Sequence, residues 1–280
     1  MKPDNQFQFA KSQHLEQVTA LRAQIDDFSY GKHAHEEFSF GVTLAGRQDF
    51  FSSGAFHRSL PGNIIVFNPG EVHDGHSGVD DALRYRMLYI HPDQLEPMLE
   101  TAGVTQSRDF RIADTLISDA QLRQRILNMA LLLEGESKSK SDNKLQQECE
   151  LYQLAARIAQ CYGEYSPDRV VRKVDRLLLQ ARDYIHANLM DEMSLDEISA
   201  QASLSKYHFL RMFRQQYGIT PHQYIINCRI NRAREALETG QLLEDVVFDY
   251  GFSDLSHFNR RFKPIYGMTP RQYQQHFIGK

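Results

Sequence analysis

The 280-residue sequence has no uninterrupted apolar run of about 18 residues, so no segment is predicted to cross a membrane as a helix. It has only three cysteines (Cys149, Cys161 and Cys228), whose spacing fits no metal or redox motif, so we expect ordinary thiols in a reducing compartment. The first residues lead into no apolar signal segment, which makes a cytoplasmic location the default expectation. No motif pairs a nucleophile with a base, which argues against an enzyme.

The chain also lacks the net positive charge that is typical of nucleic-acid-binding proteins, because its formal net charge is −4. The charge is unevenly distributed. Residues 169–280 hold 16 Lys and Arg against 12 Asp and Glu, whereas residues 1–168 hold 16 against 24. An acidic front part therefore precedes a mildly basic back part, and the length allows about two domains. We place them at residues 1–165 and 169–280.

Two segments of the back part, residues 195–218 and 243–267, share one design. Each contains a short amphipathic stretch, a turn, a second amphipathic stretch and a final glycine. Each is followed after one residue by the same exit, Thr-Pro-x-Gln-Tyr. The repeat predicts two helix-turn-helix units, with a helix over residues 222–239 between them and another over 168–188 before them. Two such units in one small all-α domain favour two DNA-reading helices.

The second helix of each predicted unit has an apolar face and a polar face. The apolar faces, expected in the core, are Leu204, Phe209, Met212 and Phe213 in the first unit, and Phe252, Leu255, Phe258 and Phe262 in the second. The polar faces repeat at i, i+3, i+4 and i+7: Tyr207, Leu210, Arg211 and Arg214, then Ser256, Asn259, Arg260 and Lys263. Arginine reads guanine, asparagine reads adenine, and Lys or Arg holds phosphate, so we predict DNA binding by these faces. One such face alone would more simply be solvated, but two matching faces disfavour that alternative.

Residues 250–263 and 267–273 resemble the AraC/XylS family of transcription regulators. The resemblance implies two helix-turn-helix units held at a fixed distance by a connecting helix, with double-stranded DNA and RNA polymerase as partners. It assigns base contact to Tyr207, Leu210, Arg211, Ser256, Asn259 and Arg260, with His208 and His257 as borderline positions. Val247, Phe248 and Asp249 depart from the small residues that are more usual before the Tyr-Gly-Phe segment.

The front part has β-rich runs at residues 38–44, 48–51, 63–67 and 83–90, separated by turns that contain glycine. Many short strands predict a small barrel or sandwich. Helical periodicity follows at 119–133 and 144–162, with a polar loop between them and a candidate linker at 163–167. Leu145, Leu151, Leu154 and Ile158 form one stripe. The stripe packs either on the barrel of its own chain or in an antiparallel homodimer contact, and one helix could do both.

Three histidines are candidates for a site in the front part. His33 and His35 precede the first strong strand, and His73 follows another. This is the pattern of cupins, in which such residues often bind a metal. The usual carboxylate would fall near Ser39 or Phe40, and neither can supply it, so we expect no metal and no cofactor. The histidines then either are hydrogen-bonded structural groups or line a small-molecule site at the barrel mouth.

Residues 41–46, 60–73 and 89–92 resemble the cupin-like, arabinose-regulator-type sensor domain of the same family, which implies a small-molecule effector. Ala45 stands where that sensor holds its sugar with arginine, so we do not expect arabinose. The candidate ligand-binding residues are His33, His35, Glu37, Thr43, His73, Tyr85 and Met87. Residues 1–20 are expected to be either an arm that closes over the ligand or an unstructured tail.

The sequence therefore predicts an α+β protein, with a cupin-like β-barrel and dimerisation helices in front and an all-α domain with two helix-turn-helix units behind. We expect a homodimeric, sequence-specific, DNA-binding transcription regulator under the control of a small molecule. The alternatives are a cupin metalloenzyme fused to a DNA-targeting domain and a dimeric activator that responds to no ligand.

Overall fold

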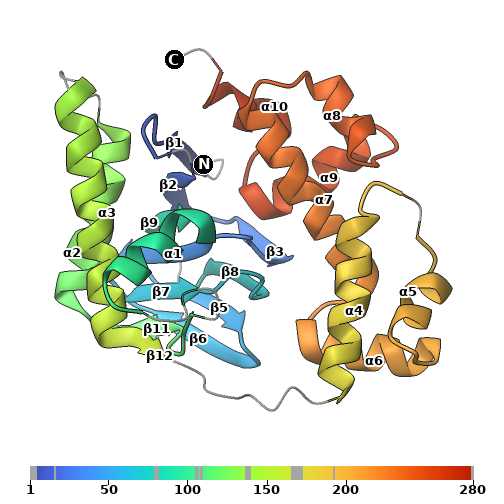
Figure 1. Ribbon diagram of the computed structural model, residues 1–280. Helices are drawn as coiled ribbons and strands as arrows, with labels where there is room; N and C mark the ends of the chain where they lie inside the picture. The colour runs from blue at the N-terminus through green and yellow to red at the C-terminus, as the bar shows by residue number, and fades with distance from the viewer. Residues whose placement is uncertain are drawn as a thin grey trace. The chain divides into compact units, whose positions relative to one another are not determined.

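The computed structural model describes residues 5–15, 17–78, 82–104, 107, 110–135, 140–164, 173–191 and 193–278. The chain divides into two compact units, Met1–Ser166 and Pro167–Lys280. None of the helices in these ranges is long and apolar enough to span a membrane. The front unit combines sheets with helices and the back unit is built of helices (Figure 1), in agreement with the predicted α+β class.

The front unit contains two main antiparallel sheets. A six-stranded sheet has the order β1-β2-β9-β4-β7-β11, and a four-stranded sheet has the order β3-β8-β5-β6. The strands are β1 (Gln6–Lys11), β2 (Val18–Ile25), β3 (Ser29–His33), β4 (Phe38–Ala45), β5 (Gln48–Ser52), β6 (Ala55–Ser59), β7 (Ile64–Phe67), β8 (His73–Ser77), β9 (Leu83–Ile90) and β11 (Leu116–Ile117). Short strands β10 (Arg111–Ile112) and β12 (Gly163–Glu164) pair separately. The helices are α1 (Pro92–Thr101), α2 (Ala120–Glu134) and α3 (Lys140–Tyr162).

Strand β4 is buried on both of its faces. Phe38, Phe40 and Val42 share a core with residues of α2 and α3, so Ser39, Gly41 and Thr43 must face the other way. Three of the four residues in the predicted stripe of α3, Leu151, Leu154 and Ile158, are fully buried in that core. The stripe therefore packs on its own chain, except for Leu145, which is 64% exposed.

The alternative of an unstructured tail over residues 1–20 is wrong for Gln6–Lys11, which form strand β1. Phe7 lies opposite Ala23 of β2, and Phe9 lies opposite Leu21. Both rings are buried, with exposures of 8% and 5%. Two aromatic side chains on one face of a short strand give it enough apolar surface to pair with β2.

Asp119 fixes the start of α2 against the end of α3. Its carboxylate accepts backbone N–H groups of Gln121 and Leu122, which caps the helix. It also accepts a hydrogen bond from the Tyr162 hydroxyl at 2.7 Å and pairs with Arg157 at 2.9 Å. Burial by itself would raise the pKa of Asp119, but these hydrogen bonds outweigh it and hold the pKa below its usual value.

The back unit contains seven helices within its described residues. They are α4 (Lys173–Ala187), α5 (Leu195–Gln201), α6 (Lys206–Tyr217), α7 (Pro221–Glu238), α8 (Leu243–Asp249), α9 (Leu255–Tyr266) and α10 (Pro270–Gln275). The repeated Thr-Pro-x-Gln exit is a capping box, in which Thr220 and Gln223, and likewise Thr269 and Gln272, satisfy the first turns of α7 and α10. Gly218 and Gly267 end α6 and α9 in the left-handed conformation.

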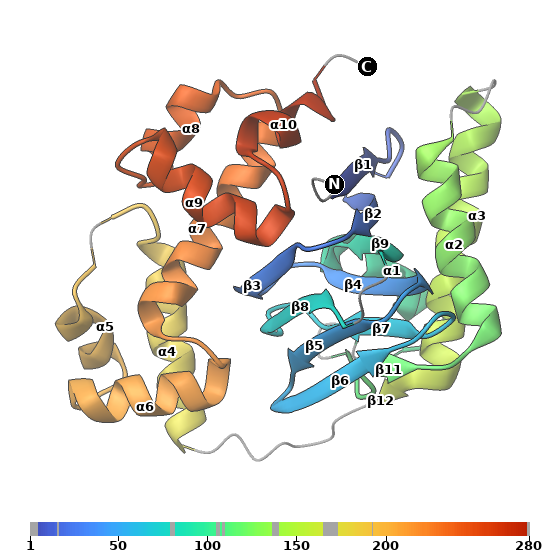
Figure 2. The same ribbon diagram turned by 180° about the vertical axis from the view of Figure 1, so that it is seen from behind.

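Helix α7 connects the two helix-turn-helix units, α5–α6 and α8–α9 (Figure 2). Its first half contributes Ile225 and Cys228 to the core of the first unit. In its second half, Asn231 accepts a hydrogen bond from Tyr266 of α9 at 3.0 Å, and Glu238 accepts one from Tyr273 of α10 at 2.7 Å. One continuous helix therefore belongs to both units and limits how far they can move apart.

Candidate DNA-binding and effector-binding sites

The predicted DNA-reading residues lie along the accessible faces of α6 and α9. Six of them are exposed: Tyr207, which is 86% exposed, Arg211, Arg214, Ser256, Arg260 and Lys263. Leu210 and Asn259 are partly buried. Phe209, Phe213, Phe258 and Phe262, on the opposite faces, are fully buried. The hydrophobic cores thus orient both helices, and each presents the face that the sequence singled out.

The basic side chains of these faces are accessible. Within the described part of the chain, the side chains of Arg211, Arg214, Arg260 and Lys263 have neither a hydrogen bond nor an ion pair, and Arg260 acts on Asp254 through its charge alone. Asp254 begins α9 by accepting the backbone N–H of His257 at 2.7 Å, and this bond holds the pKa of Asp254 below its usual value. The four cations are therefore available to an external anion such as a DNA phosphate.

The two helix-turn-helix units differ in the turn between their helices. The turn of the first unit, Ala202–Ser205, is one residue shorter than that of the second, Tyr250–Asp254. Each has one residue with positive φ, Ser203 at 50° and Gly251 at 74°. The prediction that Leu255 belongs to the core is wrong, because it is the first residue of α9 and is 44% exposed. It lies three residues before Phe258, as Lys206 lies three residues before Phe209 in the first unit, and both first residues are exposed.

Arg229, in the middle of α7, links the two helix-turn-helix units of the back unit through hydrogen bonds to backbone carbonyls. Its guanidinium donates to Leu189 O at 2.8 Å and to Asp191 O at 2.9 Å, both in the loop after α4. It also donates to Gly251 O at 3.3 Å, in the turn of the second unit. A Cβ on Gly251 would lie 2.6 Å from Arg229 Nη1, so a larger residue there would displace the guanidinium. This role could not be predicted from sequence patterns, because the acceptors are backbone atoms 22 to 40 residues away in the chain.

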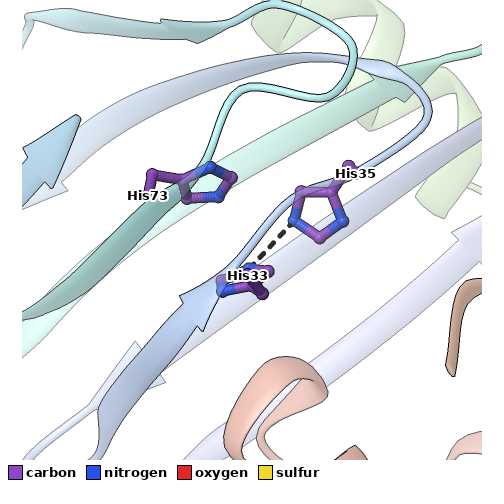
Figure 3. A group of neighbouring side chains, drawn as sticks. All are labelled: His33, His35 and His73. Atoms are coloured by element: carbon purple, nitrogen blue, oxygen red, sulfur yellow. Dashed lines mark hydrogen bonds between the residues drawn. The ribbon is translucent and has the colours of Figure 1, made fainter. Parts of the chain in front are cut away.

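The front unit brings the three candidate histidines together (Figure 3). His33 of β3 lies directly opposite His73 of β8, and His35 follows two residues after His33. One ring nitrogen from each lies within 4.8 Å of the other two, and all three side chains are buried. Burial lowers the pKa of His33 to about 4, and that of His73 also falls well below its usual value. These two rings are therefore neutral at pH 7.

Hydrogen bonds orient two of the rings. His33 Nδ1 lies 2.7 Å from Gly31 O, and His73 Nδ1 lies 2.9 Å from Glu71 O. A carbonyl only accepts, so each Nδ1 must carry the proton and each Nε2 keeps its lone pair. Our expectation of no metal rested on the missing carboxylate, whereas the structure gathers three imidazoles that do not depend on it.

The other candidate ligand residues are also buried. The Tyr85 hydroxyl lies 2.6 Å from that of Tyr30, and burial raises the pKa of both. Thr43 Oγ1 lies 2.7 Å from Ser59 Oγ. Met87 packs its sulfur over Gly41, where a Cβ would overlap it. Glu37 is only 7% exposed.

Some interior polar residues were not predicted. Tyr30 lies 6.0 Å from His33 between ring centroids, and Tyr89 lies 5.0 Å from His35. Alternation along β9 from Tyr85 and Met87 to Tyr89 could have identified the latter. Ser39 Oγ and Gln48 Oε1 are buried and have no hydrogen-bond partner among the described residues. Such groups indicate an interior that favours a polar guest.

Comparison with known proteins covers both units. A family model described as AraC-like ligand binding domain matches residues 17–155, and one described as Helix-turn-helix domain matches residues 198–276. The chain is 32% identical to the probable transcriptional regulator LumQ of Photobacterium leiognathi, over 85% of this chain and 89% of LumQ. It is 26% identical to the HTH-type transcriptional regulator YbfI of Bacillus subtilis, over 81% of this chain and 80% of YbfI.

Among solved structures, the chain is similar to wild-type ToxT of Vibrio cholerae with an unsaturated fatty acid bound. The TM-score is 0.61 at 10% identity, and the match covers 96% of this chain and 99% of ToxT. At this identity the likeness concerns the fold, and it supports the predicted combination of a β-rich front domain with a helical back domain.

Proposed function

The chain belongs to the AraC/XylS family of transcription regulators, and from this premise we propose that α6 and α9 read DNA bases under the control of an effector inside the front unit. The observation that carries the proposal is the pair of matching exposed faces, which two buried phenylalanine cores orient on either half of α7. A regulator with an AraC-type ligand-binding domain and a helix-turn-helix domain binds DNA and a small molecule.

Each reading face has residues of complementary roles. Arg211 and Arg260 lie in the first two turns of their helices, where a reading helix meets base edges, and each can donate two hydrogen bonds to guanine. Asn259 suits adenine, while Tyr207, Leu210 and Ser256 contact neighbouring base edges. Arg214 and Lys263 lie one turn later and hold phosphates.

The effector is assigned to the interior of the front unit. Ser39 and Gln48 present buried oxygens that have no partner among the described residues. Tyr30, Tyr85 and Thr43 add hydroxyl groups. These groups suit a small, hydrogen-bonding molecule. ToxT, which has a similar fold, is known with an unsaturated fatty acid bound, so in that protein the fold accommodates a small ligand.

A second copy of the chain is the partner that the α2–α3 hairpin fits. Leu131, Leu145 and Tyr152 are exposed by 49%, 64% and 40%, whereas Leu122, Ile126, Leu151, Leu154 and Ile158 of the same hairpin are fully buried. We place the homodimer contact on these three side chains, and a dimer on DNA would then recruit RNA polymerase. Leu131→Glu with Leu145→Glu should shift full-length protein from dimer to monomer in sedimentation. Unchanged dimerisation would remove this face from the proposal.

The function is tested by selecting binding sites for the full-length protein from random-sequence DNA. The expected motif has two specific segments whose centres lie about one helical turn apart. A variant that carries Arg211→Ala and Arg260→Ala should lose both segments, whereas Arg271→Ala, which removes one positive charge from an exposed position of α10, should keep them. Absence of any enriched motif with the unaltered chain would contradict DNA reading.

A further inference from the structure

We infer that His33, His35 and His73 bind one divalent transition-metal cation within the front unit. A role of this cation in regulation rests on the proposed binding of an effector in the front unit. The metal site replaces our expectation that these histidines bind no metal. Each histidine offers one ring nitrogen, and the three nitrogens lie within 4.8 Å of one another (Figure 3). The three side chains are 3%, 6% and 5% exposed, so they lie inside the unit and do not form a surface cluster that would bind metal ions nonspecifically.

The backbone orients two of the ligands before any cation arrives. Because Nδ1 of His33 donates to Gly31 O and Nδ1 of His73 donates to Glu71 O, each ring keeps a lone pair on Nε2. Metal-binding histidines commonly use their second nitrogen in this way, which fixes both the tautomer and the direction of the ring. The sheet register adds a further constraint, since His33 and His73 are direct cross-strand partners.

The third ligand requires a change of tautomer and a turn of its ring toward the cation. His33 Nε2 lies 3.1 Å from His35 Nε2. Since the His33 nitrogen is an acceptor, His35 Nε2 is the donor in the metal-free state. When a cation binds, this N–H···N bond is replaced by two metal–nitrogen bonds, and the His35 proton moves to Nδ1. Two nitrogens about 2.05 Å from a tetrahedral metal are separated by about 3.3 Å, so the observed spacing already approaches that of a ligand pair.

The ligand chemistry selects the class of cation. Three imidazoles without a carboxylate suit Zn²⁺, Fe²⁺, Ni²⁺ or Cu²⁺ and disfavour Mg²⁺ and Ca²⁺, which prefer oxygen. Three protein ligands leave at least one coordination position for another molecule. An oxygen or nitrogen atom of the effector would therefore bind directly to the cation at this open coordination position inside the front unit.

The test uses full-length protein without a histidine tag, treated with a chelator and then equilibrated with Zn²⁺ or Co²⁺. We expect about one ion per chain by elemental analysis, and a visible Co²⁺ spectrum typical of nitrogen ligands. His73→Ala should weaken binding by 10-fold or more, while His76→Ala, an exposed histidine on the same strand, should leave it unchanged. Azide added to the Co²⁺ protein should alter the spectrum, and an unaltered spectrum would refute the open position.

Failure to load either ion into the unaltered protein would overturn the inference, whatever the variants do. Because that measurement uses the native chain, it does not depend on whether His73→Ala folds. Equal binding by folded His73→Ala and native protein would overturn it as well. DNA-site selection on the same sample separates the two proposals: a specific motif without metal binding refutes only the metal, whereas metal binding without a motif refutes the proposed DNA function.

Discussion

Replacing Arg229 with alanine should loosen the connection between the two DNA-reading units without touching either reading face. The side chain donates to Leu189 O, Asp191 O and Gly251 O. The bond to Leu189 is partly buried and is worth about 1.5–3 kcal/mol, because its donor is charged. The other two acceptors are near solvent and regain water, so each adds roughly 0.5 kcal/mol. The substitution should therefore remove about 2.5–4 kcal/mol of the interaction that holds the two helix-turn-helix units together.

This cost should appear in DNA binding as a difference between paired and single sites. Each unit keeps its own core, so binding of Arg229→Ala to one half-site should remain close to that of the native protein. Binding to two half-sites on one face of the duplex should fall by about tenfold or more, since 1.4 kcal/mol already corresponds to a factor of ten. Titration of labelled duplexes at one salt concentration measures both affinities.

Two control variants separate the effect of Arg229 on the orientation of the helix-turn-helix units from the effect of its positive charge. Arg271→Ala removes the same charge from an exposed position of α10 and should affect paired and single sites alike. Arg229→Lys keeps the charge but cannot reach three carbonyls together, so it should resemble Arg229→Ala. If Arg229→Ala weakens single and paired sites by the same factor, Arg229 acts on DNA directly and the reasoning is refuted.

The remaining predictions concern two side chains of the DNA-reading faces and one helix cap in the front unit. Arg211→Ala should cost about 1–3 kcal/mol of binding and relax the preference at one base position, and an equal loss on every sequence would contradict its reading role. Lys263→Ala should weaken all sequences alike and flatten the salt dependence of binding, so a base-specific effect would contradict a phosphate contact. Asp119→Ala removes a helix cap and the partner of Arg157, so the front unit should unfold at lower denaturant, with a loss of about 2–4 kcal/mol. A loss below about 0.5 kcal/mol would show that water replaces these contacts.

The back unit could be predicted almost completely because its signals are local. Thr220 and Thr269 cap their helices with a glutamine three residues later, and Gly218 and Gly267 end theirs. Such patterns are complete within one turn of helix and do not depend on distant parts of the chain. Leu255 was misplaced because it is the first residue of α9 and is exposed there, and periodicity alone does not locate the start of a helix.

The front unit was less predictable because its contacts are distant in sequence. Strand β1 pairs with β2, and β2 pairs with β9, more than 50 residues further along. His33 and His73 were recognised as candidates, but only the register of β3 with β8 shows that they face one another. Sequence patterns give the faces of a strand, whereas register depends on the whole sheet, so the convergence of the three rings had to come from the structure.

Hydroxyl-radical footprinting of the full-length protein on its selected site tests the central claim most directly. Two reading helices on one connecting helix should protect two segments on one face of the duplex, with centres roughly 34 Å apart. Arg211→Ala should weaken protection of one segment, and Arg260→Ala should weaken protection of the other. Protection of a single segment, affected by only one of these substitutions, would mean that one helix-turn-helix unit is structural and would contradict the account.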